Sequence, residues 1–315
     1  MMNARVSRAA LVFGLCLPGA AQAAAPTVWG TGTYLTSRNC NGVAAGENCL
    51  GPTNPNLRIQ QGVYDGGAST GTNVALDPAT GGHIQSVVTF GALDLPVIKA
   101  GAWAGADNRN NSNSVGYQGF TYGGTAGTAF GLTANFDFTS SGSPASVTTS
   151  LEEPVPEIAG EGFGYLVLSL LDPSLLTGVV TAQDVFDFGF GRACGEAGVI
   201  GSASIRLGTL GAGPGAGSLT LGTDCAGNAL YLAPGASFVV SMLLQTPSNR
   251  GGFFDATHTV TLGLDPTLSE EVRTSLAATL VSAQSLVPEP GSWAMMIAGF
   301  GLVGSMQRRW RSVAA

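Results

Sequence analysis

The residues of this chain that could do chemistry are few and far apart. Ser69 lies in Gly67-Ala68-Ser69-Thr70-Gly71, which has the glycine–x–serine–x–glycine spacing of a nucleophile elbow. That motif needs a strand before the serine and a helix after it, and neither is predicted here. His258 would be the base of such a triad, with one of many aspartates. Because the chain contains 47 glycines, this match is expected by chance, and we predict no enzymatic activity.

Metal ligands are equally sparse. His83 and His258 are expected to be a turn residue and a strand-face residue rather than ligands. Calcium remains an alternative, because hard cations prefer several carboxylate oxygens, although solvated acids in a loop are the commoner case. We expect no cofactor. If calcium were bound, its candidate ligands would be Glu152, Glu153, Glu157 and Glu161.

An asparagine-rich run at residues 107–113 lies between two aromatic residues. Amide-rich loops beside exposed rings suit sugars, because rings stack on the sugar face and amides bond its hydroxyls. The alternative is a polar turn between strands whose aromatic residues belong to the core. The candidate sugar-binding residues are Trp103, Asn108, Asn110, Asn111 and Tyr117.

Four cysteines remain once a predicted leader is removed, namely Cys40, Cys49, Cys194 and Cys225. An even number in an exported chain predicts disulfides. We favour Cys40 with Cys49 and Cys194 with Cys225, because each pair is nearest in sequence, although three pairings are open. A metal site is disfavoured because the chain has no Cys-x-x-Cys and both histidines are distant in sequence.

Most of the chain is predicted to form short strands separated by glycine, asparagine and proline turns. Alternation is clearest from Phe130 to Thr139, where apolar and polar residues follow the period of two of a half-buried strand. Residues 27–55 are expected to be rich in loops, and residues 268–286 to begin with a short helix or form a final strand. The predicted strands are residues 57–64, 83–92, 96–104, 114–122, 130–139, 164–171, 199–207, 218–221, 229–232, 237–245 and 257–264.

This pattern predicts an all-β body, an antiparallel β-sandwich or jelly roll, at residues 24–286. Residues 142–162 carry three prolines and four glutamates. The stretch is either a linker that divides the body into two sheets or subdomains, or a long acidic loop.

The beginning of the chain reads as a signal peptide, residues 1–23. Arg5 and Arg8 precede the apolar run Ala9–Leu17, and Ala21-Gln22-Ala23 supplies small residues for signal peptidase. We expect cleavage after Ala23, so that the body lies outside the cytoplasm.

Residues 287–315 combine a Pro-Glu-Pro turn, an apolar run and a basic cluster. Residues 292–306 would form a transmembrane helix about 22 Å long, short against a hydrocarbon core of about 30 Å. Arginines after the helix favour a cytoplasmic C-terminus by the positive-inside rule. This stop-transfer cluster consists of Arg308, Arg309 and Arg311.

The same segment resembles the PEPxxWA form of the PEP-CTERM sorting signal. The matching residues are Pro288, Glu289, Pro290, Trp293 and Ala294. The resemblance implies a Gram-negative bacterium and an exosortase, a membrane transpeptidase that cuts near Pro-Glu-Pro and passes the protein to the cell surface. It also implies an association with exopolysaccharide.

The net charge of the body limits the classes of partner that it can bind. The terminal segments contain Arg5, Arg8, Arg308, Arg309, Arg311 and Glu289, so the body keeps eight of the 13 basic residues and 19 of the 20 acidic ones, a net of −11. Such a body disfavours nucleic acid, whose binding needs contacts from Lys and Arg to phosphate. We therefore expect a non-enzymatic cell-surface or matrix protein, held in the inner membrane during transit. Its expected partners are signal peptidase, exosortase and exopolysaccharide. A carbohydrate-binding sandwich is the alternative, and a surface hydrolase is a further one.

Overall fold

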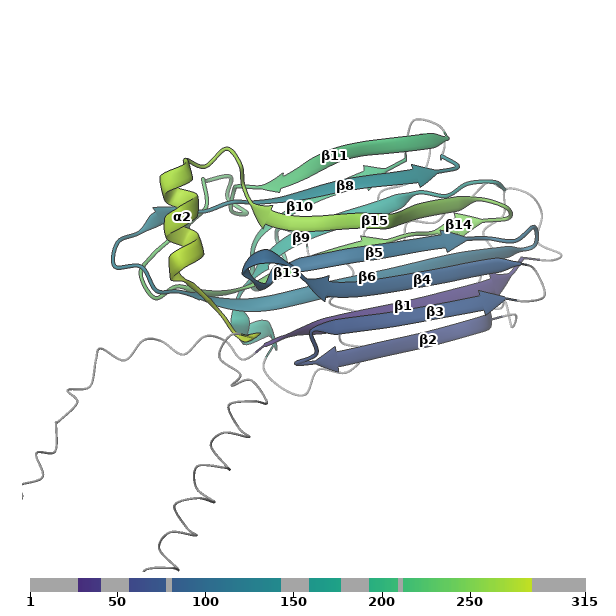
Figure 1. Cartoon of the computed structure of the whole chain (residues 1–315), viewed down its shortest axis with the longest axis horizontal. Helices are drawn as coiled ribbons and strands as arrows, with labels where there is room; N and C mark the ends of the chain where they lie inside the picture. Colours follow the sequence, from purple (N-terminus) through teal and green to yellow (C-terminus); the bar gives the residue numbers. More distant parts are fainter. Residues whose placement is uncertain are drawn as a thin grey trace, which may run out of the picture.

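The body is a sandwich of two antiparallel β-sheets (Figure 1). The computed structural model describes residues 28–40, 57–77, 81–142, 159–176, 193–208 and 212–284. The predicted signal peptide, the sorting segment with its helix and arginines, Cys49, Glu152, Glu153 and Glu157 lie outside the described residues. No helix in the described ranges is long and apolar enough to cross a membrane.

Sheet A is the larger sheet, and β14 (Ser248–Asn249) and β16 (Leu280–Ser282) also pair with its strand β6. Its strand order is β10 (Val199–Leu207), β9 (Gly164–Leu171), β13 (Ser237–Gln245), β6 (Asn108–Tyr122), β1 (Trp29–Asn39) and β2 (Leu57–Gly66).

Sheet B covers one face of sheet A. Its strand order is β11 (Gly213–Leu221), β8 (Leu132–Ser140), β15 (Phe253–Leu264), β5 (Pro96–Trp103), β4 (Gly82–Phe90) and β3 (Thr70–Asp77). The remaining described elements are a small pair, β7 (Thr128–Ala129) with β12 (Tyr231–Leu232), the short helices η1 (Ala92–Asp94) and η2 (Pro173–Leu176), and α2 (Glu270–Thr279).

The main hydrophobic core lies between the sheets because alternate residues of each strand point inward. Phe120 and Leu168 of sheet A and Phe254 of sheet B belong to this core and are at most 1% exposed. Toward β1 and β4 the interior is mixed. A smaller apolar cluster of Leu35, Ala75, Ile84 and Ala102 lies there, and the hydroxyls of Ser86 and Ser114 join the two sheets at 2.6 Å. The sandwich is therefore held by apolar packing throughout, with hydrogen bonds between the sheets added in this part.

Helix α2 lies across one end of the sandwich (Figure 1). The Ser269 side chain caps it by accepting a hydrogen bond from the Val272 backbone N–H, and Leu276 is fully buried. The chain then continues into β16, which pairs with β6. Residues 268–286 therefore contain both of the predicted elements, the helix first.

Two predictions about the strands were wrong. Residues 27–55 were expected to be loop-rich, but Trp29–Asn39 form β1, which pairs with β2 and β6. Most of β1 is buried on both faces, so its sequence lacks the alternation that marks a half-buried strand. Strand β3 was missed as well. Strands β9, β10 and β13 have the predicted bounds.

The proline-rich stretch at residues 142–162 does not separate the two sheets. Strands from both sides of it enter sheet A and sheet B, and Gly142 bridges Gly162 across it.

The core makes a matched prediction for two leucines. Leu168→Ala should lower the free energy of unfolding by about 2–5 kcal/mol, because it leaves a cavity in a fully buried site. Leu76→Ala, at a side chain that is 70% exposed, should change it by no more than about 0.5 kcal/mol. Urea denaturation of the two variants measures the difference, and equal effects would contradict this core.

Candidate functional site

The asparagine run is not the predicted loop, because it forms the first half of β6. Asn108 and Asn110 are fully buried between the sheets. The Asn110 side-chain amide donates to the Trp103 carbonyl at 2.6 Å, and that of Asn108 donates to the Ser37 hydroxyl at 3.3 Å. Pairing with β1 over eleven positions holds this segment extended despite the poor strand propensity of asparagine. The exposed amides that the sugar-binding hypothesis required are absent here.

Asn111 and Tyr117 lie on the other face of β6, and both are buried. The Tyr117 ring stacks on Tyr64 with centroids 6.2 Å apart, and the two hydroxyls are hydrogen-bonded. Burial, together with the Tyr64 hydrogen bond, raises the pKa of Tyr117 well above its ordinary value. Tyr117 is therefore a packed ring and not an exposed platform.

Trp103 is the one candidate sugar-binding residue that is partly exposed. It ends β5 on the outer face of sheet B, where its ring stacks on His83 with centroids 3.8 Å apart. His83 lies in β4 and not in the expected turn.

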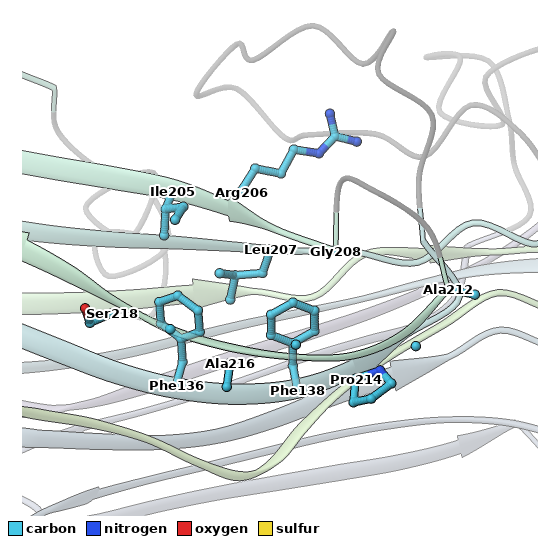
Figure 2. A pocket seen from close by; sticks show the side chains of 13 residues that line it. Phe136, Phe138, Ile205, Arg206, Leu207, Gly208, Ala212, Pro214, Ala216 and Ser218 are labelled. Atoms are coloured by element: carbon cyan, nitrogen blue, oxygen red, sulfur yellow. The ribbon is translucent and has the colours of Figure 1, made fainter.

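A groove opens between β10 and β11, where the two sheets end at the same side of the sandwich (Figure 2). Its volume is about 410 Å³. Phe136 and Phe138 of β8 line it opposite Ile205 and Leu207 of β10. The groove is concave and mainly apolar.

Alternate glycines of β11 make room for this groove. Gly215 and Gly217 stand directly opposite Phe138 and Phe136 in the β8–β11 pairing. A Cβ atom on Gly215 would lie within 2.4 Å of the Phe138 ring, and one on Gly217 within 3.1 Å of the Phe136 ring. The two rings therefore occupy space that side chains of β11 would otherwise fill.

The charge of the groove comes from a single side chain among the described residues that line it. This is Arg206, and Figure 2 shows its side chain pointing away from the two rings. Its guanidinium lies 4.1 Å from the centre of the Phe163 ring. Burial lowers the pKa of Arg206, and the nearby Glu161 acts in the opposite direction. The groove thus suits an uncharged occupant.

The nucleophile elbow does not have the context that its chemistry requires. Ser69 lies in the turn between β2 and β3, so a strand follows it instead of a helix. The side chain of His258, the proposed base, is 81% exposed and belongs to a bulge of β15. Its Nδ1 atom is 3.8 Å from Oδ2 of Asp137.

No group of three or more potential metal ligands occurs within the described residues. Of the four glutamates considered for calcium, Glu161 falls in a described range, and it is 4% exposed near Arg206.

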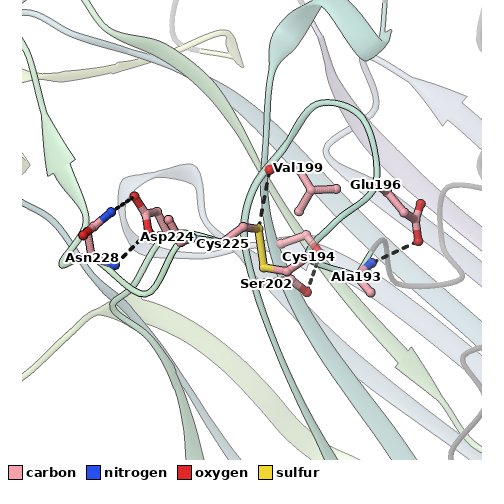
Figure 3. Close-up of a disulfide and its surroundings, with 10 residues drawn as sticks. Ala193, Cys194, Glu196, Val199, Ser202, Asp224, Cys225 and Asn228 are labelled. Carbon is pink, nitrogen blue, oxygen red and sulfur yellow. Dashed lines mark hydrogen bonds between the residues drawn. A yellow bond between two sulfur atoms is a disulfide. The ribbon is translucent and has the colours of Figure 1, made fainter.

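The predicted Cys194–Cys225 disulfide is present (Figure 3), with Cα atoms 5.1 Å apart. It ties the segment before β10 to the turn after β11. The Asp224 carboxylate holds that turn by accepting hydrogen bonds from the backbone N–H groups of Ala226 and Asn228, at 2.9 and 2.8 Å. Cys40 is disulfide-bonded as well, while its predicted partner Cys49 lies outside the described residues.

A family model for the PEP-CTERM protein-sorting motif matches residues 286–312. The chain carries a PEP-CTERM sorting motif. A motif of this kind implies export to the cell envelope or surface, with an exosortase as the processing partner. The match covers the five predicted motif residues and the three arginines, all outside the described residues.

No curated protein matches the chain at a significant level. Among solved structures, it is similar to TmCBM61, whose structure is described as a complex with β-1,4-galactotriose. The identity is 8% and the TM-score 0.26, over 63% of this chain and 90% of TmCBM61. So low a TM-score does not establish a common fold.

The disulfide should stabilise the body measurably. Replacing Cys194 and Cys225 together by alanine should lower the free energy of unfolding by about 3–4 kcal/mol, because the bond closes a loop of 31 residues in the unfolded chain. Urea denaturation without reductant measures this difference, because the disulfide of Cys40 then stays intact in both the wild type and the variant. A change below about 1 kcal/mol would contradict a stabilising role.

The glycine pattern of β11 predicts a second effect. Gly215→Ala should destabilise the body by about 1–3 kcal/mol, because the new methyl group meets the Phe138 ring. Ser218→Ala, at an exposed position of the same strand, is the control and should be near neutral. Thermal melts of both variants test whether the ring packs over this glycine.

Proposed function

We propose that this protein is an exported, non-enzymatic component of the cell surface or extracellular matrix, associated with exopolysaccharide. The observation that carries the proposal is the sorting motif at residues 286–312. The order of its parts supports a defined route. A leader starts export, a short apolar segment stops it in the inner membrane, and the exosortase then cuts near Pro288-Glu289-Pro290.

The properties of the body support a passive role outside the cell. Disulfides stabilise proteins in oxidising compartments, and Cys194–Cys225 is one such bond. The excess of acids keeps the body soluble and disfavours other polyanions. The apolar lining of the β10–β11 groove suits binding better than proton transfer.

Carbohydrate binding is the second candidate function. The specific observation in its favour is the partly exposed ring of Trp103 on the outer face of sheet B. Rings in such positions stack on the apolar faces of sugars, and this role requires no catalytic group.

The sorting proposal is tested in the native bacterium by replacing Pro288, Glu289 and Pro290 together with alanine. Wild-type protein should appear at the surface or in the medium with a mass that lacks the residues after about Pro290. The variant should stay in the membrane at full length, because the motif that the exosortase recognises is lost.

Pro234→Ala is the matched control, since this proline lies in an exposed turn of the body and should not affect processing. Fractionation, immunoblotting and intact-mass measurement report the outcome. Wild-type protein that remains uncut in the membrane would overturn the proposal, and so would a triple variant that is released normally.

A further inference from the structure

Four side chains form a row across the outer face of sheet B. In the strand pairings, Leu76 of β3 stands opposite His83 of β4, His83 opposite Trp103 of β5, and Trp103 opposite Phe253 of β15. Neighbouring strands are about 4.8 Å apart, so this row extends over about 15 Å. We call it the Trp103 row.

The Trp103 ring is held in place by its neighbours. It stacks on the His83 ring with an angle of 13° between their planes. Its far edge leans over Gly101, where a Cβ atom would lie within 2.4 Å of the ring. A side chain at position 101 would push the ring away, so the glycine permits this orientation. A ring that is already fixed loses little conformational freedom on binding.

Polar side chains flank the position over which the ring leans. Gln85 of β4 and Asp255 of β15 stand opposite Gly101 on either side, and both are half-buried. Asp255 Oδ1 accepts hydrogen bonds from Thr257, from its backbone N–H at 2.9 Å and its hydroxyl at 2.6 Å. These bonds orient the carboxylate at the start of the β15 bulge. Bulges often occur beside binding sites, where they change the direction of a side chain.

The imidazole of His83 adds a further hydrogen-bonding group. Burial lowers the pKa of His83, and the charge of Asp255 partly opposes this shift. The ring is therefore favoured in its neutral form, which has one N–H donor and one acceptor nitrogen.

The surface around the row is unusually apolar for this chain. The exposed large hydrophobic residues found in the described ranges are Val74, Leu76 and Tyr231, at 52%, 70% and 66%. Val74 and Leu76 both lie on β3 beside Gln85 and His83. Two of these three side chains therefore lie next to the row and add apolar surface to it.

The mixture of groups favours a sugar over a protein partner. Protein interfaces have apolar cores from which charged groups are depleted, whereas this row places an amide, an imidazole and a carboxylate directly beside its rings. Ring faces match the C–H faces of sugars, and the polar groups match their hydroxyls. The acidic charge of the body disfavours an anionic polysaccharide, leaving a neutral one.

We propose that the Trp103 row, with Gln85 and Asp255, is a binding site for a neutral polysaccharide. Trp103 stacks on a sugar ring with the face that His83 leaves uncovered, while the Gln85 amide donates or accepts hydrogen bonds with the sugar hydroxyls and the Asp255 carboxylate accepts them. This inference deepens the proposed association with exopolysaccharide and assigns it to residues. The amides of Asn108, Asn110 and Asn111 take no part, because they are buried within the sandwich.

The test uses mature protein secreted by its own bacterium and the exopolysaccharide of that organism, separated by anion exchange into neutral and acidic fractions. Native electrophoresis in gels containing each fraction measures affinity. The neutral fraction should retard the wild type, and Trp103→Ala should weaken its binding roughly tenfold or more. Trp103→Phe should retain part of the affinity, and Gln85→Ala should weaken it with the stacking ring intact.

Tyr231→Ala is the matched control, because Tyr231 is an exposed aromatic residue on β12, away from the row. It should bind like the wild type, and unchanged melting temperatures for all variants exclude misfolding. Three results would overturn the proposal: no retardation by the neutral fraction, retardation by the acidic fraction alone, or equal losses for Trp103→Ala and Tyr231→Ala. Processing at Pro-Glu-Pro is measured separately, so failed sorting and failed binding are distinguishable.

Discussion

The pairing of β6 with its neighbours is the constraint on which the rest of the structure depends. This strand has fifteen residues, all of them buried, and it pairs with β1, β13, β14 and β16. It therefore joins the beginning of the described chain to its end within one sheet. Because both of its edges and both of its faces are occupied, the polar residues of β6 are stabilised where they find partners. Asn110 and Ser114 meet this condition through bonds that also cross to sheet B.

Glycines in the strands shape the surface by leaving room for neighbouring aromatic rings. Gly101 lets the Trp103 ring lean along its own strand, and Gly215 lets the Phe138 ring extend over a neighbouring strand. A ring near a strand glycine covers backbone that would otherwise be poorly packed. The two sites nevertheless differ in chemistry, because polar groups surround Trp103 whereas apolar residues line the groove at β11. The same device thus produces a hydrogen-bonding surface in one place and an apolar groove in another.

The sequence predicted the all-β sandwich and several strands because each of those strands has a clear apolar pattern between turn residues. Strand β9 is a continuous apolar run, and β8 alternates, so both were visible. Strand β1 and the first half of β6 could not be recognised in the sequence. Their glycine, threonine, serine and asparagine residues show no periodicity that distinguishes a strand buried on both faces from a loop. Of the five candidate sugar-binding residues, Trp103 alone is partly exposed. The groups now placed beside it, Gln85 and Asp255, come from strands far apart in sequence, which spacing along the chain does not reveal.

The position of Trp103 relative to the end of the described chain favours a role at the surface. The last described strand, β16, pairs with β6, and the Ser282 hydroxyl donates a hydrogen bond to Asp94, just before β5 begins. Trp103 ends β5, eight residues long, so it lies about 25 Å farther along the strand direction. The described chain therefore ends near one end of the strands, while Trp103 lies near the other. A body attached through its C-terminus would thus present the Trp103 row away from the attachment point, where a matrix polysaccharide could reach it.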